Sequence, residues 1–166
     1  MSIVYILKEE CRVDIKAVYD RQSRTIYHLA MTYLKNTADA EDAVQNVFIN
    51  YIKNKPEFKS LEHEKAWFIV ATKNYCKNLL KNFWKTKVDM GDVPEKNNEE
   101  IEEDSLLLDK IMELPVKYRE VLYLYYYEEY SIREISELLS RKESTIQTQL
   151  AAARQKLKNI LGKEKQ

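Results

Sequence analysis

Glycine is so scarce in this chain that its scarcity limits the available folds more than any other feature. Among 166 residues there are two glycines, Gly91 and Gly162, and three prolines. Phosphate-binding loops and dinucleotide fingerprints need several glycines for tight turns and close backbone approach. An all-β fold needs turn residues at regular intervals. With 45% apolar and 33% charged residues, the composition instead predicts an all-α globular protein.

The chain also lacks the sequence signals of a membrane or metal protein. Its apolar runs are far shorter than a membrane span, and residues 2–7 have no basic flank or cleavage-site pattern. Cys11 and Cys76 are widely spaced thiols that fit a reducing compartment, and with His28 and His63 they do not match a zinc site. We expect a cytoplasmic protein with no membrane insertion, no metal and no cofactor.

Charge is segregated along the chain although 27 basic and 27 acidic side chains cancel. Residues 59–88 carry seven lysines against two glutamates, and residues 141–166 carry seven basic groups against two acids. Between them, residues 89–104 carry eight acids against one lysine. Such dense like charge cannot bury apolar surface and predicts a solvated linker. We therefore expect two domains, residues 1–88 and 105–166, joined by the acidic linker 89–104.

Apolar residues at helical spacing predict three helices in the first half, with stripes over residues 26–34, 40–52 and 69–83. Thr37 is the expected N-cap of the second helix and Ser60 of the third, and a further helix is expected before the first stripe.

Shorter helices are predicted in the second half, over residues 107–114 and 118–126. A capping box at residues 131–134 predicts the start of the next helix, and a second capping box at residues 144–147 predicts the start of the last helix. A short capped helix, a brief turn and a longer capped helix indicate a helix-turn-helix.

No set of catalytic residues is present, so we predict a protein that is not an enzyme. His28 and His63 have no nucleophile partner in the sequence. The acids Asp39, Glu41 and Asp42 are open to two interpretations, a metal site or carboxylates at the positive end of a helix dipole, and the second is favoured.

The last predicted helix has a polar outer face with cations on its flanks. The residues opposite its core stripe are Ser144, Thr148, Ala151, Ala152 and Gln155. The flanks hold Gln147, Arg154 and Lys158 on one side and Thr145, Gln149 and Lys156 on the other. DNA recognition needs short polar groups near base edges and cations near phosphates. An ordinary solvated face would contain glutamate, and residues 144–155 contain none, which favours DNA binding.

A second basic segment combines lysines with aromatic residues. Lys73, Lys77 and Lys81 recur every four residues, close to Trp67 and Tyr75. Cations along a backbone track with rings for unstacked bases suit single-stranded nucleic acid. The alternative is that the rings are core and the lysines only solvated; the absence of interspersed acids favours the first interpretation.

Three segments, in order, resemble a known family across nearly the whole chain. They are residues 39–48, residues 66–81, and residues 114–121 continuing through 131–135 to 145–154. Together they resemble the extracytoplasmic-function sigma factors of bacterial RNA polymerase. The resemblance implies a region-two-like helical bundle and a C-terminal helix-turn-helix domain, with core RNA polymerase and promoter DNA as partners. An anti-sigma factor would be a further partner.

The resemblance also implies roles for individual residues. Contact with the polymerase clamp would fall to Asp39, Glu41, Asp42, Gln45 and Phe48. The minus-ten element, as duplex opens and a base is flipped, would be held by Phe58, Lys59, Ser60, His63, Trp67, Lys73, Asn74, Lys77 and Lys81. The minus-thirty-five duplex would be contacted by Arg141, Lys142, Ser144, Thr145, Gln147, Thr148, Ala151, Ala152, Arg154 and Lys158.

The chain departs from the family pattern at several positions. Gln147, Gln149 and Ala152 are neutral where the family commonly has basic residues, and Glu129 and Ser140 stand where it usually has glycine. Fewer cations release fewer phosphate counterions and so predict weaker, less salt-sensitive duplex binding. The tyrosines at 123–127 are interpreted as part core and part contact with the polymerase flap.

We predict a sigma factor that recruits core polymerase, recognises both promoter elements and assists strand opening. Two alternatives remain: a polymerase-independent helix-turn-helix regulator, and a sigma-like helical protein that binds a regulator without reading DNA.

Overall fold

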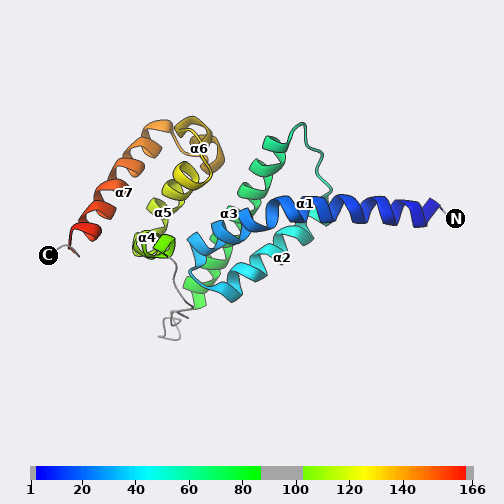
Figure 1. Cartoon of the computed structure of the whole chain (residues 1–166), viewed down its shortest axis with the longest axis horizontal. Helices are drawn as coiled ribbons and strands as arrows, with labels where there is room; N and C mark the ends of the chain where they lie inside the picture. Colours follow the sequence, from blue (N-terminus) through cyan, green and yellow to red (C-terminus); the bar gives the residue numbers. More distant parts are fainter. Residues whose placement is uncertain (1–2, 87–102, 164–166) are drawn as a thin grey trace.

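The chain is all-α, which confirms the predicted fold class. A computed structural model describes residues 3–86 and 103–163, and no strand occurs in those ranges (Figure 1). The N-terminal bundle contains α1 (Ile3–Leu34), α2 (Thr37–Asn54) and α3 (Leu61–Thr86). The C-terminal bundle contains α4 (Glu103–Met112), α5 (Val116–Leu122), a π-helix η1 (Tyr123–Tyr127), α6 (Ile132–Leu139) and α7 (Glu143–Lys163).

Helix α1 is longer than predicted because the expected separate helix before the first stripe is continuous with it. Residues 3–34 contain no glycine or proline, so nothing in the backbone chemistry interrupts the helix. Its N-terminal part extends past α2 (Figure 1). Its C-terminal part packs against both α2 and α3.

The caps of α2 and α3 explain where those helices begin. The Asn36 side chain accepts a hydrogen bond from the Asp39 amide at 3.0 Å, so Asn36 is the N-cap and the prediction of Thr37 was wrong by one residue. Thr37 already lies inside the helix. Ser60 Oγ accepts from the His63 amide at 3.0 Å, which confirms the predicted capping role of Ser60.

In the C-terminal bundle one of the two predicted capping boxes is present. The Glu134 amide donates to Ser131 Oγ at 3.2 Å, and the Ser131 amide donates to Glu134 Oε2 at 2.8 Å. The second box was wrong, because α7 begins at Glu143 and Ser144 is already helical. The Ser144 carbonyl instead accepts from Thr148 Oγ1 at 2.9 Å within the helix.

Helix ends and turns use the left-handed backbone region without glycine. The residues with positive φ are Lys35 (55°), Lys55 (44°), Glu129 (57°) and Ser140 (53°). Glu129 and Ser140 are the two positions at which the resemblance leads one to expect glycine. A side chain in this region costs about 1–2 kcal/mol, so both turns are strained where a glycine would relieve them.

The helix predicted over residues 118–126 changes type partway. It begins as α5 and continues as the π-helix η1, which ends where the Glu128 amide donates to the Tyr123 carbonyl at 3.2 Å. The wider turn divides the tyrosines between two environments: Tyr123 is buried, whereas Tyr126 and Tyr127 are 54% and 49% exposed.

The two bundles pack against each other rather than standing apart. Helix α1 contacts α5 and α3 contacts α6, and in Figure 1 the C-terminal bundle lies alongside α1 and α3. One apolar cluster joins them, including Leu29 and Ile69 from the first bundle and Val121 and Ile135 from the second. The predicted linker 89–104 lies largely outside the described residues, and α4 begins at Glu103, inside its predicted end.

Candidate nucleic-acid interface

The acidic start of α2 presents an open polar surface. The polar residues predicted for polymerase contact are all exposed: Asp39, Glu41, Asp42 and Gln45. Ala40, Ala43, Val44 and Val47 alternate with them at helical spacing and are buried, which turns the polar residues outward. Negative side chains also suit this end of a helix dipole. The surface is therefore available to a positively charged partner.

Phe48 lies apart from that polar surface. It is 5% exposed, and its ring lies 4.9 Å from the Tyr19 ring and 5.2 Å from the Phe68 ring, measured between centroids. A partner cannot touch this side chain in the present conformation. Phe48 instead fixes α2 against α1 and α3.

The loop before α3 and the first turns of that helix form an aromatic corner. Phe58 lies 5.4 Å from the His63 ring and 6.1 Å from the Trp67 ring. The Lys59 amide donates to His63 Nδ1 at 3.1 Å, so the histidine fixes the loop backbone. Lys59, Ser60 and His63 are exposed, whereas Phe58 and Trp67 are half-buried. The structure thus brings these five predicted residues into one small region.

The remaining predicted minus-ten residues divide between two faces of α3. Trp67, Asn74 and Lys81 recur at intervals of seven, which places them along one face, and Asn74 and Lys81 are exposed. Lys73 and Lys77 lie on another face, toward the C-terminal bundle. The expected track of lysines is therefore incomplete: Lys73 is buried, Lys77 is half-exposed and Lys81 is exposed, because a spacing of four on a long helix rotates toward a neighbouring element.

Lys73 and Lys77 are held by the C-terminal bundle. Lys73 is 8% exposed, and its Nζ donates to the Leu138 carbonyl at the end of α6 at 2.9 Å. Burial, with the charge of Lys77, lowers the pKa of Lys73 below its ordinary value. Lys77 Nζ lies 3.9 Å from Glu120 Oε2.

Helix α7 exposes most of the face predicted to meet duplex DNA. Its core side is Ile146, Leu150 and Ala153, all buried. The exposed predicted residues are Lys142, Ser144, Thr145, Gln147, Thr148, Ala151, Arg154 and Lys158, with Ala152 and Arg141 half-buried. The polar and neutral character expected from the sequence is thus present on the outer surface.

Two arginines of that set already have protein partners. Arg154 Nε donates to the Tyr126 hydroxyl at 2.6 Å, and its guanidinium carbon lies 5.3 Å from the Tyr125 ring centroid. Arg141 pairs with Glu120 and donates to Gln149 Oε1 at 3.0 Å. Both guanidinium groups are therefore positioned by neighbouring side chains, Arg154 in an exposed place and Arg141 in a half-buried one.

Sequence reasoning missed a buried ionic seam between the bundles. We define the seam as Tyr33, Lys73, Lys77, Arg119, Glu120 and Arg141. Glu120 is 1% exposed, and its carboxylate accepts from the Tyr33 hydroxyl of α1 and pairs with Arg141. Burial, followed by the charge of Glu120, raises the pKa of the Tyr33 hydroxyl.

Arg119 ties together the carboxyl ends of two helices. It is 4% exposed; its Nε donates to the Thr32 carbonyl at 2.7 Å and its Nη2 to the Tyr33 carbonyl at 3.3 Å, both in the last turn of α1. Its Nη1 donates to the carbonyls of Met112, the last residue of α4, and of Leu114, at 3.2 and 2.8 Å. Burial lowers the pKa of Arg119 to about 10. Cations suit helix carboxyl ends, where carbonyls lack helical partners.

The sequence carries no local signal for this seam. Helix α5 contains Lys117, Arg119 and Glu120, and neighbouring residues lie only about 100° apart on a helix, so adjacent charges can share one polar face.

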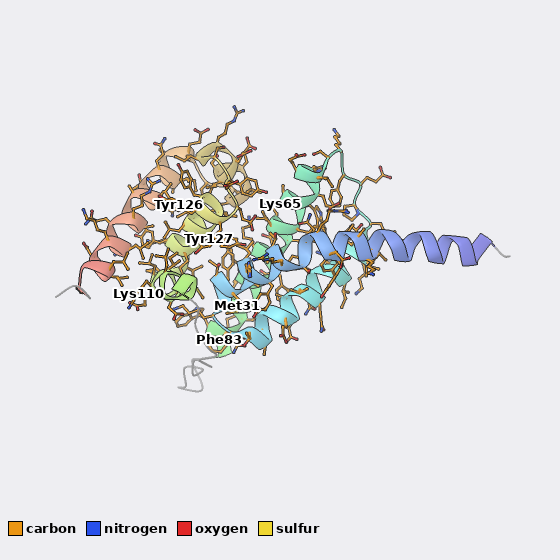
Figure 2. The ribbon with its side chains drawn as sticks, in the orientation of Figure 1. Met31, Lys65, Phe83, Lys110, Tyr126 and Tyr127 are labelled. Atoms are coloured by element: carbon orange, nitrogen blue, oxygen red, sulfur yellow. The ribbon has the colours of Figure 1, made fainter. Side chains whose placement is uncertain are left out.

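A third contact between the bundles lies near the surface. Lys65 on α3 pairs with Glu128 at 2.5 Å, and its ammonium lies 5.5 Å from the Tyr130 ring centroid. Figure 2 shows Lys65 on the part of α3 that faces the C-terminal bundle.

An apolar groove of about 590 Å³ runs between α4, η1 and α7. It is lined by Leu107, Ile111, Leu122, Tyr126, Tyr127, Arg154, Leu157, Lys158, Leu161 and Gly162. Both exposed tyrosines of η1 therefore line this groove.

The described residues contain neither a candidate metal site nor a candidate membrane span. Within residues 3–86 and 103–163, no three His, Cys, Asp or Glu side chains are grouped so as to hold a metal ion. None of the helices in those ranges is both long enough and apolar enough to span a membrane.

Comparison with known proteins gives matches over both bundles. The family profile described as "Sigma-70 region 2" matches residues 18–86, and that described as "Sigma-70, region 4" matches residues 105–157. RNA polymerase sigma factor SigV of Bacillus subtilis is 28% identical over 141 residues, covering 83% of this chain and 85% of that protein. ECF RNA polymerase sigma factor SigW of the same species is 27% identical, covering 92% and 90%.

A solved structure has the same fold. The sigma factor RpoE of Bartonella quintana, crystallised in complex with the anti-sigma factor NepR, superposes with a TM-score of 0.74 at 18% identity. The superposition covers 90% of this chain and 97% of that chain.

Proposed function

Because this chain belongs to the extracytoplasmic-function group of the sigma-70 family, and so is an RNA polymerase sigma factor of transcription initiation, we propose that three of its surfaces divide the work of promoter recognition. Two matched regions in the family order, each with an exposed polar surface, carry this proposal. The alternatives of a polymerase-independent regulator and a sigma mimic are not favoured, because both leave one region without a role. The protein acts without catalysis, in the cytoplasm where its polymerase is.

The first surface is the acidic start of α2, which binds the clamp of core RNA polymerase. Asp39, Glu41, Asp42 and Gln45 supply exposed acceptors for a basic partner. Phe48 acts from the core by holding α2 in place. The apolar groove beside Tyr126 and Tyr127 supplies a second contact with polymerase, at the flap.

The second surface is the aromatic corner with Asn74, which holds a flipped base of the minus-ten element. Extruding a base costs a few kcal/mol of stacking, which ring contacts and an amide partner can offset. Phe58 and Trp67 supply half-buried rings. Asn74 supplies an exposed amide on the same face of α3 as Trp67, about two turns further along the helix.

The third surface is the outer face of α7, which enters the major groove of the minus-thirty-five element. Gln147 and Thr148 present polar groups to base edges, and Ala151 permits close approach. With few cations on this face, the duplex contact is weak alone and depends on polymerase for its affinity. A regulator such as an anti-sigma factor would compete for the same surfaces.

The test is transcription in vitro with purified core polymerase. The full chain should direct synthesis from one promoter class, and Asn74→Ala should impair strand opening, measured by permanganate reactivity of the melted thymines, while core binding is retained. Asn78→Ala, on an exposed part of the same helix, is the matched control. Loss of core binding by Asn74→Ala would refute its role in opening, and no promoter-specific product would refute the function.

A further inference from the structure

Glu64 is a buried carboxylate that α1 holds with three hydrogen bonds. It is 5% exposed and lies in the first turn of α3. Arg21 Nε donates to Glu64 Oε1 at 3.0 Å, Arg21 Nη2 donates to Glu64 Oε2 at 2.9 Å, and Gln22 Nε2 donates to Oε1 at 2.9 Å. Burial alone would raise the pKa of Glu64, but these hydrogen bonds and the charge of Arg21 outweigh it and keep that pKa below its ordinary value. A guanidinium bonded to both oxygens fixes the orientation of a carboxylate as well as its distance.

The same turn of α3 carries the aromatic corner. His63, the residue before Glu64, has its ring 5.4 Å from the Phe58 ring. The Glu64 amide donates to the Ser60 carbonyl at 3.1 Å. Trp67 follows Glu64 by three residues, and positions three apart are neighbours on a helix surface. Any rotation or shift of this turn would therefore move the rings of the corner.

The contact between Glu64 and α1 is polar where an apolar contact would be less costly. Gln22 is 5% exposed, and its Oε1 has no hydrogen-bond partner among the residues that the structure describes. A buried acceptor without a partner is destabilising, and a buried ion pair is often no more stabilising than apolar side chains of the same volume. Hydrogen bonds are directional, however, so they select one orientation of α3 against α1. These features favour a role in orientation over a role in stability.

We propose that Glu64 is a positioning residue for minus-ten recognition: held by Arg21 and Gln22, it fixes the first turn of α3 and keeps the aromatic corner in the shape that receives a flipped base. Glu64 is buried and acts through Phe58 and Trp67 rather than by touching DNA. The inference rests on the function proposed for the corner. A preformed corner binds a base more tightly, because its rings and loop are ordered before the base arrives.

Such preorganisation acts on selectivity as well as on affinity. A corner of fixed shape admits one base better than another, whereas rings that move freely stack on any base, since every base has a π-face. Loosening Glu64 should therefore reduce the discrimination between bases. A loss of stability alone would not, because it lowers the folded fraction and with it the affinity for every strand by the same factor.

Three variants of the full chain isolate the role of Glu64. Glu64→Gln keeps the side-chain length but replaces one oxygen with an amide nitrogen, which cannot accept from Arg21. Gln22→Met removes the third donor together with the unpaired oxygen, so it should be at least as stable as the wild type. Glu62→Gln is the matched control, because it makes the same charge change on an exposed residue of the same turn. Urea unfolding measures the stability of each variant.

The first measurement needs no DNA. With Trp84→Phe in every chain, Trp67 is the sole tryptophan, and quenching of its fluorescence by acrylamide reports how well the corner excludes solvent. Quenching should increase in Glu64→Gln and, by less, in Gln22→Met, while Glu62→Gln should match the wild type. Unchanged quenching in Glu64→Gln would show that Glu64 does not order the corner.

The second measurement is the discrimination between bases. The complex of each chain with core polymerase is titrated with short strands of oligothymidine, oligocytidine and oligoadenosine, and core polymerase alone gives the baseline. The ratio of the tightest to the weakest affinity should fall by about three- to tenfold in Glu64→Gln, because the stacking of one base is at stake. It should fall by less in Gln22→Met, despite the stability of that variant. Glu62→Gln acts on every strand alike, so its ratio should equal that of the wild type.

The outcomes separate this inference from the function on which it rests. A wild-type complex that binds the strands no better than core polymerase alone, or binds all three equally, would overturn the function proposed for the corner and this inference with it. A wild-type ratio that Glu64→Gln leaves unchanged would overturn this inference alone, and an equal fall in Glu62→Gln would assign the effect to charge. If Glu64→Gln fails to fold, Gln22→Met decides: reduced discrimination in a stable variant supports the positioning role, and unchanged discrimination refutes it.

Discussion

Ser140 closes α6 in a backbone conformation that favours glycine. Its φ is 53°, and its amide donates to the Glu137 carbonyl at 3.3 Å. We expect Ser140→Gly to raise the free energy of unfolding by about 1 kcal/mol, because glycine has no side-chain clash in the left-handed region. Urea unfolding measures this. Ser136→Gly, inside α6, should instead lower stability by about 1 kcal/mol; a loss in both variants would contradict the assignment of strain to Ser140.

Phe48 and Gln45 are close in sequence but differ in what they do. Phe48→Ala should lower the free energy of unfolding by about 3–5 kcal/mol, because it leaves a cavity among packed rings. Gln45→Ala should change stability by less than about 0.5 kcal/mol and weaken capture of core polymerase in a pull-down. Stability is measured in urea. If Phe48→Ala kept its stability and lost only polymerase binding, Phe48 would be a direct polymerase contact, contrary to the assignment made here.

Residue-level prediction from the sequence succeeded where a rule is local. The capping roles of Ser60 and of the Ser131–Glu134 box were predictable because each depends on hydrogen bonds within one helical turn. Exposure was harder to predict for Lys73, because a lysine every fourth residue looks solvated until the helix gains a neighbour on that face.

At the scale of the element, the capping box sets the start of α6. We expect Ser131→Ala to lower the free energy of unfolding by about 1 kcal/mol, because the Glu134 amide would lose its acceptor. Ser136→Ala on the same helix is the control: its hydroxyl donates to the Arg133 carbonyl within the helix, so its loss should have little effect. Urea unfolding distinguishes them, and equal losses would argue against a specific contribution of the cap.

Helix positions were largely predictable because apolar periodicity reports them directly. The stripes at 26–34, 40–52 and 69–83 all fall within observed helices. What periodicity misses is a change of helix type, since η1 keeps the same apolar sequence pattern with a wider turn. It also places the first residue of a helix only to within a turn, as the N-cap Asn36 of α2 and the start of α7 at Glu143 illustrate.

At the scale of the molecule, buried tyrosines couple stability to alkaline pH. Burial raises the pKa of Tyr130 to about 12 from an ordinary 10.0, and it also raises the pKa of Tyr33 and Tyr123. Below pH 10 both folded and unfolded chains keep these protons. Above it the unfolded chain releases them first, so stability should fall as pH rises from 10 toward 12, by about 1.4 kcal/mol per pH unit for each group.

Urea unfolding over this pH range, followed by tyrosinate absorbance, measures that loss. The phenols of Tyr33 and Tyr123 should ionise together with unfolding. Ionisation of these two in a chain that stays folded near pH 10 would contradict their burial. Tyr33→Phe, which has no hydroxyl to titrate, should show a shallower decline than the wild type.

The arrangement of the two bundles was beyond sequence reasoning. Charge segregation predicted two units, but which side chains meet across them depends on the relative orientation of elements such as α1 and α5, which no local pattern encodes. Nothing in the sequence around Arg119 and Glu120 indicated that both would be buried, or that Thr32 and Tyr33 would be their partners.

The wide turn at Tyr123–Tyr127 holds one more residue than an α-helical turn would. A π-helix accommodates that residue between its bonded groups. Deleting one residue there would restore ordinary winding and leave the following residues close to their present orientation. Deleting one residue from the α-helical part of the same segment would instead rotate everything that follows by about 100° about the helix axis, and Glu128 would then turn away from Lys65. A relative that is one residue shorter in this helix should therefore have lost that residue from the wide turn.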